Sequence, residues 1–146
     1  MNYTILAHNA NYIPPVTKPA PTFLEEVGEE GIRDLLRRLY LELDVSPIRK
    51  IFPPSNTEGM LEASQVSADF FIQICGGPAY FNQNHGMPQM RGRHAPFTIT
   101  AEGRLHWLIC FETALKPLEE NISEKSLQSF WNYINIFSIM MINTQG

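Results

Sequence analysis

The sequence predicts an all-α protein in which four main helices are accompanied by one long loop. Apolar residues recur at spacings of three and four in each helical segment, and hydroxyl, glycine or proline residues mark the ends of these segments. No stretch shows the alternation of apolar and polar residues that is typical of a half-buried strand. A chain of 146 residues is the usual length for one domain. We therefore expect one helical domain over residues 22–146, preceded by an arm over residues 1–21.

The arm is predicted from its prolines, each of which removes a backbone donor and restricts the preceding residue to extended conformations. They are Pro14, Pro15, Pro19 and Pro21. The sequence leaves three alternatives open for this arm: it packs on the domain through Tyr3, Ile5 and Tyr12, it mediates a dimer, or it is a partly ordered tail.

The first two helices are predicted over residues 29–44 and from Thr57 to the Gly76-Gly77-Pro78 stop. Between them, Pro47 begins a short turn through Ile51 that the prolines at 53 and 54 end. The inward faces are Ile32, Leu35, Leu36, Leu39, Tyr40 and Leu43 on the first helix, and Met60, Ala63, Ser67, Phe70, Phe71 and Ile74 on the second.

Thr100 and Ser123 are predicted to cap the last two helices. The third helix carries an apolar stripe of Leu105, Leu108, Ile109, Phe111 and Leu115, with Trp107 beside it. The fourth carries Leu127, Phe130, Trp131, Ile134, Phe137 and Met141. Residues 78–97 hold three prolines and two glycines, so we expect a loop there with one short helical turn.

Composition excludes several classes of protein. The net charge of -4 argues against a nucleic-acid-binding surface, which needs clustered basic residues. The most apolar segment, residues 134–142, is too short to cross a bilayer, and the first residues lack the pattern of a secretory signal, so we expect a cytoplasmic protein. In that reducing compartment Cys75 and Cys110 are expected to be buried thiols, with a disulfide as the alternative.

The long loop holds the residue types that haem iron requires. His94 offers one imidazole, the neighbouring Met87, Met90 and Phe97 are apolar, and Arg91 and Arg93 are cations suited to propionates. On residue types alone, however, a solvated loop histidine is the commoner case. The cysteines and histidines show no spacing typical of a zinc site, and both cysteines have apolar neighbours, which disfavours cysteine catalysis.

The segment "GGPAYFNQNHGMPQMRGRHAPF" at residues 76–97, followed by Trp107-Leu108 and Cys110, resembles the signature of the group II truncated haemoglobins. The resemblance runs from "RRLY" at residues 37–40 through the last helix and leaves out the arm. It implies a two-over-two globin fold in which four main helices sandwich haem b, iron protoporphyrin IX, and the long loop carries the proximal histidine.

The resemblance also assigns residues to the two sides of the haem. On the proximal side His94 holds the metal, and its other ring nitrogen donates to a main-chain carbonyl. The haem-binding residues implied are Phe52, Tyr80, Met90, Arg91, Arg93 and Phe97, with the arginines near the propionates and Phe52 stacked from the distal side. The distal residues implied are Tyr40 and Trp107 as donors to the bound ligand, with Ala63 and Ser67 at the distal gate.

The function implied is reversible binding of oxygen, NO and CO at a five-coordinate iron, with high oxygen affinity. Turnover of NO or peroxide would need an external reductase, since the chain has no room for a flavin or nicotinamide domain. A peroxidase in its own right needs a distal base, which Ala63, Ser67 and Phe52 do not supply. The alternative from another class is a haem-free globin-like interaction module in which Arg91 and Arg93 bind an anion. The sequence is compatible with a monomer or a homodimer.

Overall fold

The computed structural model describes residues 1–7, 14–52 and 57–144, and all regular structure in these ranges is helical. The α-helices are α1 (Pro21–Asp44), α2 (Thr57–Ile74), α3 (Tyr80–His85), α4 (Met90–His94), α5 (Ala101–Leu115) and α6 (Glu124–Phe137). Short 3-10 helices occur at Arg49–Ile51, Lys116–Leu118 and Ser138–Met141. The all-α prediction is therefore confirmed, with four long helices and two short ones.

Helix α1 contains a break that divides it into two parts. Gly28 has φ 78° and ψ 163°, a conformation that glycine adopts without strain. The part after Gly28 corresponds to the predicted helix, whereas the part from Pro21 to Val27 was missed. Proline is tolerated there because the first helical position needs no backbone donor.

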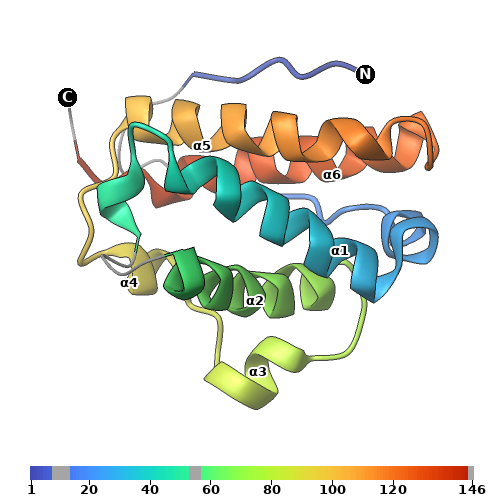
Figure 1. The fold of residues 1–146 in the computed structure, drawn as a ribbon, viewed down its shortest axis with the longest axis horizontal. Coiled ribbons are helices and arrows are strands. Elements are labelled where there is room, and N and C mark those ends of the chain that lie inside the picture. Colours follow the sequence, from blue (N-terminus) through green and yellow to red (C-terminus); the bar gives the residue numbers. More distant parts are fainter. Residues whose placement is uncertain (8–13, 53–56, 145–146) are drawn as a thin grey trace.

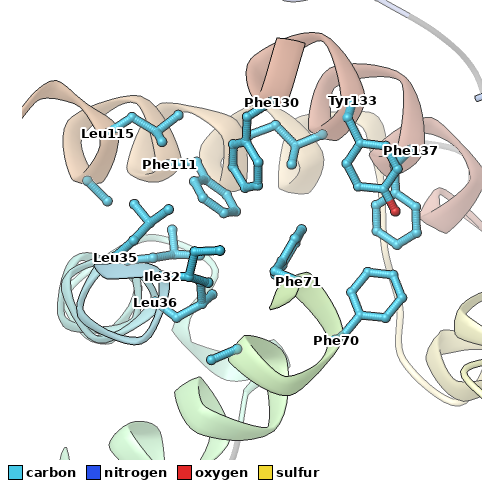
Figure 2. Packing of buried hydrophobic residues seen from close by; sticks show 14 of the residues in the cluster. Ile32, Leu35, Leu36, Phe70, Phe71, Phe111, Leu115, Phe130, Tyr133 and Phe137 are labelled. Atoms are coloured by element: carbon cyan, nitrogen blue, oxygen red, sulfur yellow. The ribbon is translucent and has the colours of Figure 1, made fainter. Parts of the chain in front are cut away.

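The core lies where the four long helices meet (Figures 1 and 2). Side chains of α1, α2, α5 and α6 converge there. Phe71 of α2 contacts Phe111 of α5 and Phe130 of α6, with ring centroids 5.7 and 5.6 Å apart. All the residues predicted to face inward on the first and last helices are buried. Helix α3 contributes only Phe81 to this core, where it packs against Phe70, and α4 contributes no buried residue, so both short helices also depend on other contacts for their position.

The predicted caps of α5 and α6 and the predicted end of α2 are confirmed. Thr100 Oγ1 accepts a hydrogen bond from the Gly103 amide at 3.0 Å, and Ser123 Oγ accepts one from the Ser126 amide at 3.2 Å. After α2, Gly76 has φ 98°, the left-handed region that glycine tolerates at the end of a helix. The prolines at 53 and 54 lie outside the described residues.

Two predictions need correction. Residues 78–97 contain two short helices rather than one turn, because a few residues between the prolines are enough for each. On α5, Leu105 and Ile109 are 40% and 48% exposed, so they do not belong to the buried stripe. The buried face of α5 instead includes Arg104, whose polar head finds partners on α6 and the N-terminal residues.

Residues 1–7 pack along α6 as an extended segment (Figure 1). The Asn2 amide donates to Gln128 Oε1 at 2.9 Å, and Asn135 and Trp131 both donate to the Thr4 carbonyl. Tyr3 and Ile5 are half-buried against the core, whereas Tyr12 lies outside the described residues. The first residues of the arm therefore pack on the domain.

Cys75 and Cys110 are free and buried. Burial raises the pKa of the Cys75 thiol to about 12, so this side chain stays protonated.

Within the described ranges, no helix combines the length and the apolar character that crossing a lipid bilayer requires.

Candidate functional site

A cavity of about 440 Å³ opens between α1, α2, α4, α5 and the segment after α6. This volume lies in the range of about 300–1,000 Å³ that is usual for cofactor and ligand sites. Its apolar lining consists of Ile48, Ile51, Phe52, Ala63, Val66, Phe70, Phe71, Phe81, Met90, Phe97, Ile99, Gly103, Trp107, Phe137 and Met141. The polar members are Tyr40, Ser67, Arg93, His94, Arg104 and Ser138.

His94 is oriented by its own short helix. Its Nδ1 atom lies 2.6 Å from the main-chain oxygen of Met90, four residues earlier. Because a carbonyl only accepts hydrogen bonds, Nδ1 must carry a proton, and in this tautomer it is Nε2 that offers the lone pair for a metal. This is the hydrogen bond that the resemblance implies, and it prepares His94 to bind a metal through Nε2.

The two arginines of this segment differ in their surroundings. Arg93 lines the cavity, but its guanidinium donates to the carbonyls of His85, Met87 and Pro88 at 2.6–3.3 Å. It also lies over the ring of Phe81, 4.9 Å from its centroid. Arg93 therefore holds the turn between α3 and α4. Arg91 is exposed and is not among the residues that line the cavity.

Tyr80 does not reach the cavity, in contrast to its implied haem-binding role. Its hydroxyl donates to Glu29 Oε1 at 2.8 Å, and the guanidinium of Arg33 lies over its ring. The next residue of α3, Phe81, lines the cavity instead, while the side chain of Tyr80 turns toward α1. In this structure Tyr80 connects α3 to α1.

Tyr40 and Ser67 form a pair of hydroxyl groups in the cavity wall. Their oxygens lie 2.7 Å apart, and the ring of Tyr40 meets Phe52 edge to face with centroids 5.6 Å apart. One hydroxyl donates to the other, so one of the two protons is left for a further acceptor. Burial raises the pKa of Tyr40, against a smaller opposing effect of the Ser67 hydrogen bond, so the phenol remains a donor at neutral pH.

Trp107 and Ala63 complete this side of the cavity. The Trp107 ring packs edge to face on Phe111, with centroids 5.0 Å apart, and Trp107 is one of the residues that line the cavity. Ala63 lies one helical turn before Ser67 on α2. The structure thus brings Tyr40, Ser67 and Trp107 to one cavity as three sources of N–H or O–H donors.

Sequence reasoning did not identify Arg104 and Ser138 as cavity residues. Arg104 is 4% exposed, and its Nε donates to Ser138 Oγ at 2.8 Å. A signal existed in the sequence, because Arg104 precedes the buried Leu108 and Phe111 at helical spacing and therefore shares their face.

The donor set fits haem better than a bare metal ion. Among the described residues, no group of three or more His, Cys, Asp or Glu side chains could hold a metal ion. A porphyrin supplies four nitrogens of its own, so a single oriented histidine in a largely apolar cavity is sufficient. His94, with a free Nε2 lone pair and apolar neighbours, meets this requirement.

Comparison with known proteins finds relatives that are all globins. The family described as bacterial-like globin matches residues 22–143. Over 92 residues the chain is 37% identical to the group 2 truncated haemoglobin YjbI of Bacillus subtilis, which covers 62% of this chain and 67% of that protein.

Two solved structures show the same fold over most of the chain. The phosphate-bound Hell's gate globin IV has a TM-score of 0.85 at 35% identity, covering 98% of this chain and 88% of that one. The truncated oxygen-avid haemoglobin of Bacillus subtilis has a TM-score of 0.73 at 29% identity, covering 85% and 99%. The chain therefore belongs to the bacterial-like globin family and has the two-over-two fold of the group II truncated haemoglobins.

Proposed function

We propose that this chain is a cytoplasmic haem b protein that reversibly binds oxygen, NO and CO, with His94 as the single protein ligand to a five-coordinate iron. The family supports haem-based ligand binding in general. The observation that carries the assignment to His94 is the hydrogen bond from its Nδ1 to the Met90 carbonyl, inside a mostly apolar cavity. That bond fixes both the tautomer and the direction of the ring.

The chain's own residues then act on the ligand through hydrogen bonds. What haem supplies when bound is iron that binds a diatomic molecule and shifts electron density onto it. Tyr40 or Ser67 and the Trp107 indole offer preorganised donors to that charge in a cavity of low polarity. Donors that are already in place gain more there than in water, because no solvent has to be reorganised.

Slow release of oxygen is the expected result of this arrangement. Two hydrogen bonds to a partly charged acceptor are worth roughly 3–6 kcal/mol, and each 1.4 kcal/mol is a factor of about ten in dissociation. The related Bacillus subtilis protein is described as oxygen-avid, which supports the proposal. Such affinity suits ligand chemistry or sensing better than oxygen delivery.

Ligand binding is better supported than peroxidase activity in its own right. Of the described side chains that line the cavity, Tyr40, Arg93, His94 and Arg104 are titratable, and none is a carboxylate or a second histidine. A general base for peroxide is therefore missing from this set. Turnover of NO or peroxide would require an external reductase to return the iron to the ferrous state.

The test is the absorption spectrum of the purified protein supplied with haemin. The wild type should show a strong Soret band and bind one haem per chain, and His94→Ala should lose the band or shift it strongly. His106→Ala is the matched control, because His106 lies on α5 but does not line the cavity. A folded wild-type protein without haem would contradict the proposal and leave the haem-free interaction module.

A further inference from the structure

Arg104 is a buried cation whose partners are all neutral. It is 4% exposed and donates to Ser138 Oγ and Asn135 Oδ1, each at 2.8 Å. It also donates to the main-chain carbonyls of Asn135 and Leu6. These contacts give acceptors to four of the five N–H groups of the guanidinium but carry no negative charge. The guanidinium therefore remains a full positive charge inside the domain.

Some other arginines of the chain pair with carboxylates. Arg33 pairs with Asp69 at 3.0 Å and Arg49 pairs with Asp44 at 2.7 Å. Arg104 has no carboxylate partner among the described residues. Burial lowers its pKa to about 10, which still leaves the side chain charged at neutral pH.

The positive charge of Arg104 lies in the wall of the cavity. Arg104 and its partner Ser138 both line the cavity that holds His94, Tyr40 and Trp107. Salt screens a buried charge poorly, so its field extends into the cavity even where no hydrogen bond is formed. A positive field of this kind lowers the free energy of any negative charge placed in the cavity.

We propose that Arg104 makes the cavity selective for negatively charged ligands over neutral ones, by supplying a permanent positive charge to its wall. The inference rests on the proposed function, because the ligand and the redox state are observed through haem. Residues 1–7 contribute to this arrangement, since the Leu6 carbonyl is one of the acceptors that hold the guanidinium in place. The chain's own positive charge thus adds to the hydrogen-bond donors described above.

The test removes the charge in two independent ways. Arg104→Gln removes it directly. Ser138→Asp keeps the arginine and places a carboxylate at the position that accepts from Arg104 Nε, so that the pair is neutral. Ser138→Asn has nearly the same shape as Ser138→Asp without its charge, and it serves as the reference for that variant. If Arg104→Gln fails to fold, the Asp and Asn pair still tests the proposal.

Arg38→Gln is the control for loss of a partly buried arginine elsewhere. Arg38 donates to the Ala114 carbonyl at 3.0–3.1 Å, is also without a carboxylate partner at hydrogen-bond distance, and does not line the cavity. Its variant should leave ligand selectivity unchanged.

The readouts are azide affinity of the ferric protein, CO affinity of the ferrous protein and the midpoint potential. Two unit charges roughly 10 Å apart at an effective dielectric constant of about 20 change an equilibrium roughly tenfold. Azide affinity should therefore fall roughly tenfold in Arg104→Gln, and in Ser138→Asp relative to Ser138→Asn, while affinity for neutral CO changes little. The midpoint potential should fall by about 59 mV, which is the same tenfold change for one electron.

The outcomes separate this inference from the proposed function. A wild-type protein that binds no haem would overturn both. A haem-loaded wild type in which the charge-removing variants lower azide affinity less than about threefold, or lower azide and CO affinity equally, would overturn the inference alone. Selective loss of azide affinity in both charge-removing variants would support it.

Discussion

The two sides of the cavity are built in different ways. Tyr40, Ser67 and Trp107, which we call the distal cluster, stand on the long helices α1, α2 and α5, and Tyr40 is only 7% exposed. The proximal segment, residues 85–97, contains α4, a helix of five residues of which none is buried. The distal cluster therefore stands on helices that build the core, with Tyr40 buried in it and Trp107 packed against it, whereas the proximal segment is attached to the edge of the core.

Different interactions hold these two regions. The distal cluster is fixed by apolar packing, as in the edge-to-face contacts of Tyr40 with Phe52 and of Trp107 with Phe111. The proximal segment is held by side chains that donate to its carbonyls, Arg93 from within and Asn143 from the C-terminal end, which donates to Phe97 at 2.9 Å. Packing therefore fixes the donors of the distal cluster, whereas His94 lies on a segment that a few hydrogen bonds hold in place.

The largest effect is expected on the oxygen dissociation rate, when donors of the distal cluster are removed. Tyr40→Phe and Trp107→Phe each remove one donor, and together they should raise the oxygen dissociation rate by about 10²–10⁴, since the two hydrogen bonds are worth roughly 3–6 kcal/mol. Stopped-flow mixing measures this rate. Tyr133→Phe is the control, because Tyr133 is buried but does not line the cavity. Unchanged rates in both single variants would refute the distal account.

The second-largest effect is expected on the free energy of unfolding, when one phenylalanine from each side of the cavity is replaced. Phe71 and Phe97 both line the cavity, but Phe71 is 4% exposed and Phe97 is 46% exposed. Phe71→Ala should lower the free energy of unfolding by about 3–5 kcal/mol, because it leaves a void among packed rings. Phe97→Ala should cost about 1 kcal/mol or less. Urea unfolding of both variants decides this, and equal losses would show that the two sides are not built differently.

A smaller effect is expected from the arginines of the proximal segment. Arg93→Met removes the hydrogen bonds to the carbonyls of His85, Met87 and Pro88 and should cost about 1–2 kcal/mol, with faster amide exchange over residues 85–97. Arg91→Met is the matched control, since Arg91 is exposed and should change neither quantity. Hydrogen-exchange mass spectrometry makes the comparison. Equal exchange in both variants would mean that Arg93 does not hold the segment.

The smallest effect concerns Asp69, which connects the core to the proximal segment. Burial alone would raise its pKa, but hydrogen bonds from Arg33, Asn84 and His85 outweigh this and hold the pKa below its ordinary value. A depressed pKa stabilises the fold above the unfolded value of about 3.9, and this contribution is lost as the pH falls below it.

Asp69→Asn should therefore be less stable than the wild type at pH 7, by about 1 kcal/mol, and the difference should shrink as the pH falls below about 4. Urea midpoints at pH 7, 5 and 3 measure it. A difference that stays constant over this range would show that the Asp69 charge plays no part in holding α3.

Local patterns were sufficient for the fold class and for most of the helices. The inward faces of α1 and α6 and the caps Thr100 and Ser123 followed from spacing and residue type, because these features depend on neighbours within a few residues. The same rule misplaced Leu105 and Ile109, since α5 is apolar on more than one side and periodicity alone cannot choose between them.

By itself, the sequence determined that the chain is helical and that its motif points to His94, since both depend on residues close together in the chain. Only the tertiary structure decided that Tyr80 turns toward Glu29, that Arg93 holds carbonyls and that Arg104 is buried beside the cavity. The physical reason is that a long polar side chain takes the partner that folding brings near it. For Arg104 one such partner is the carbonyl of Leu6, 98 residues away.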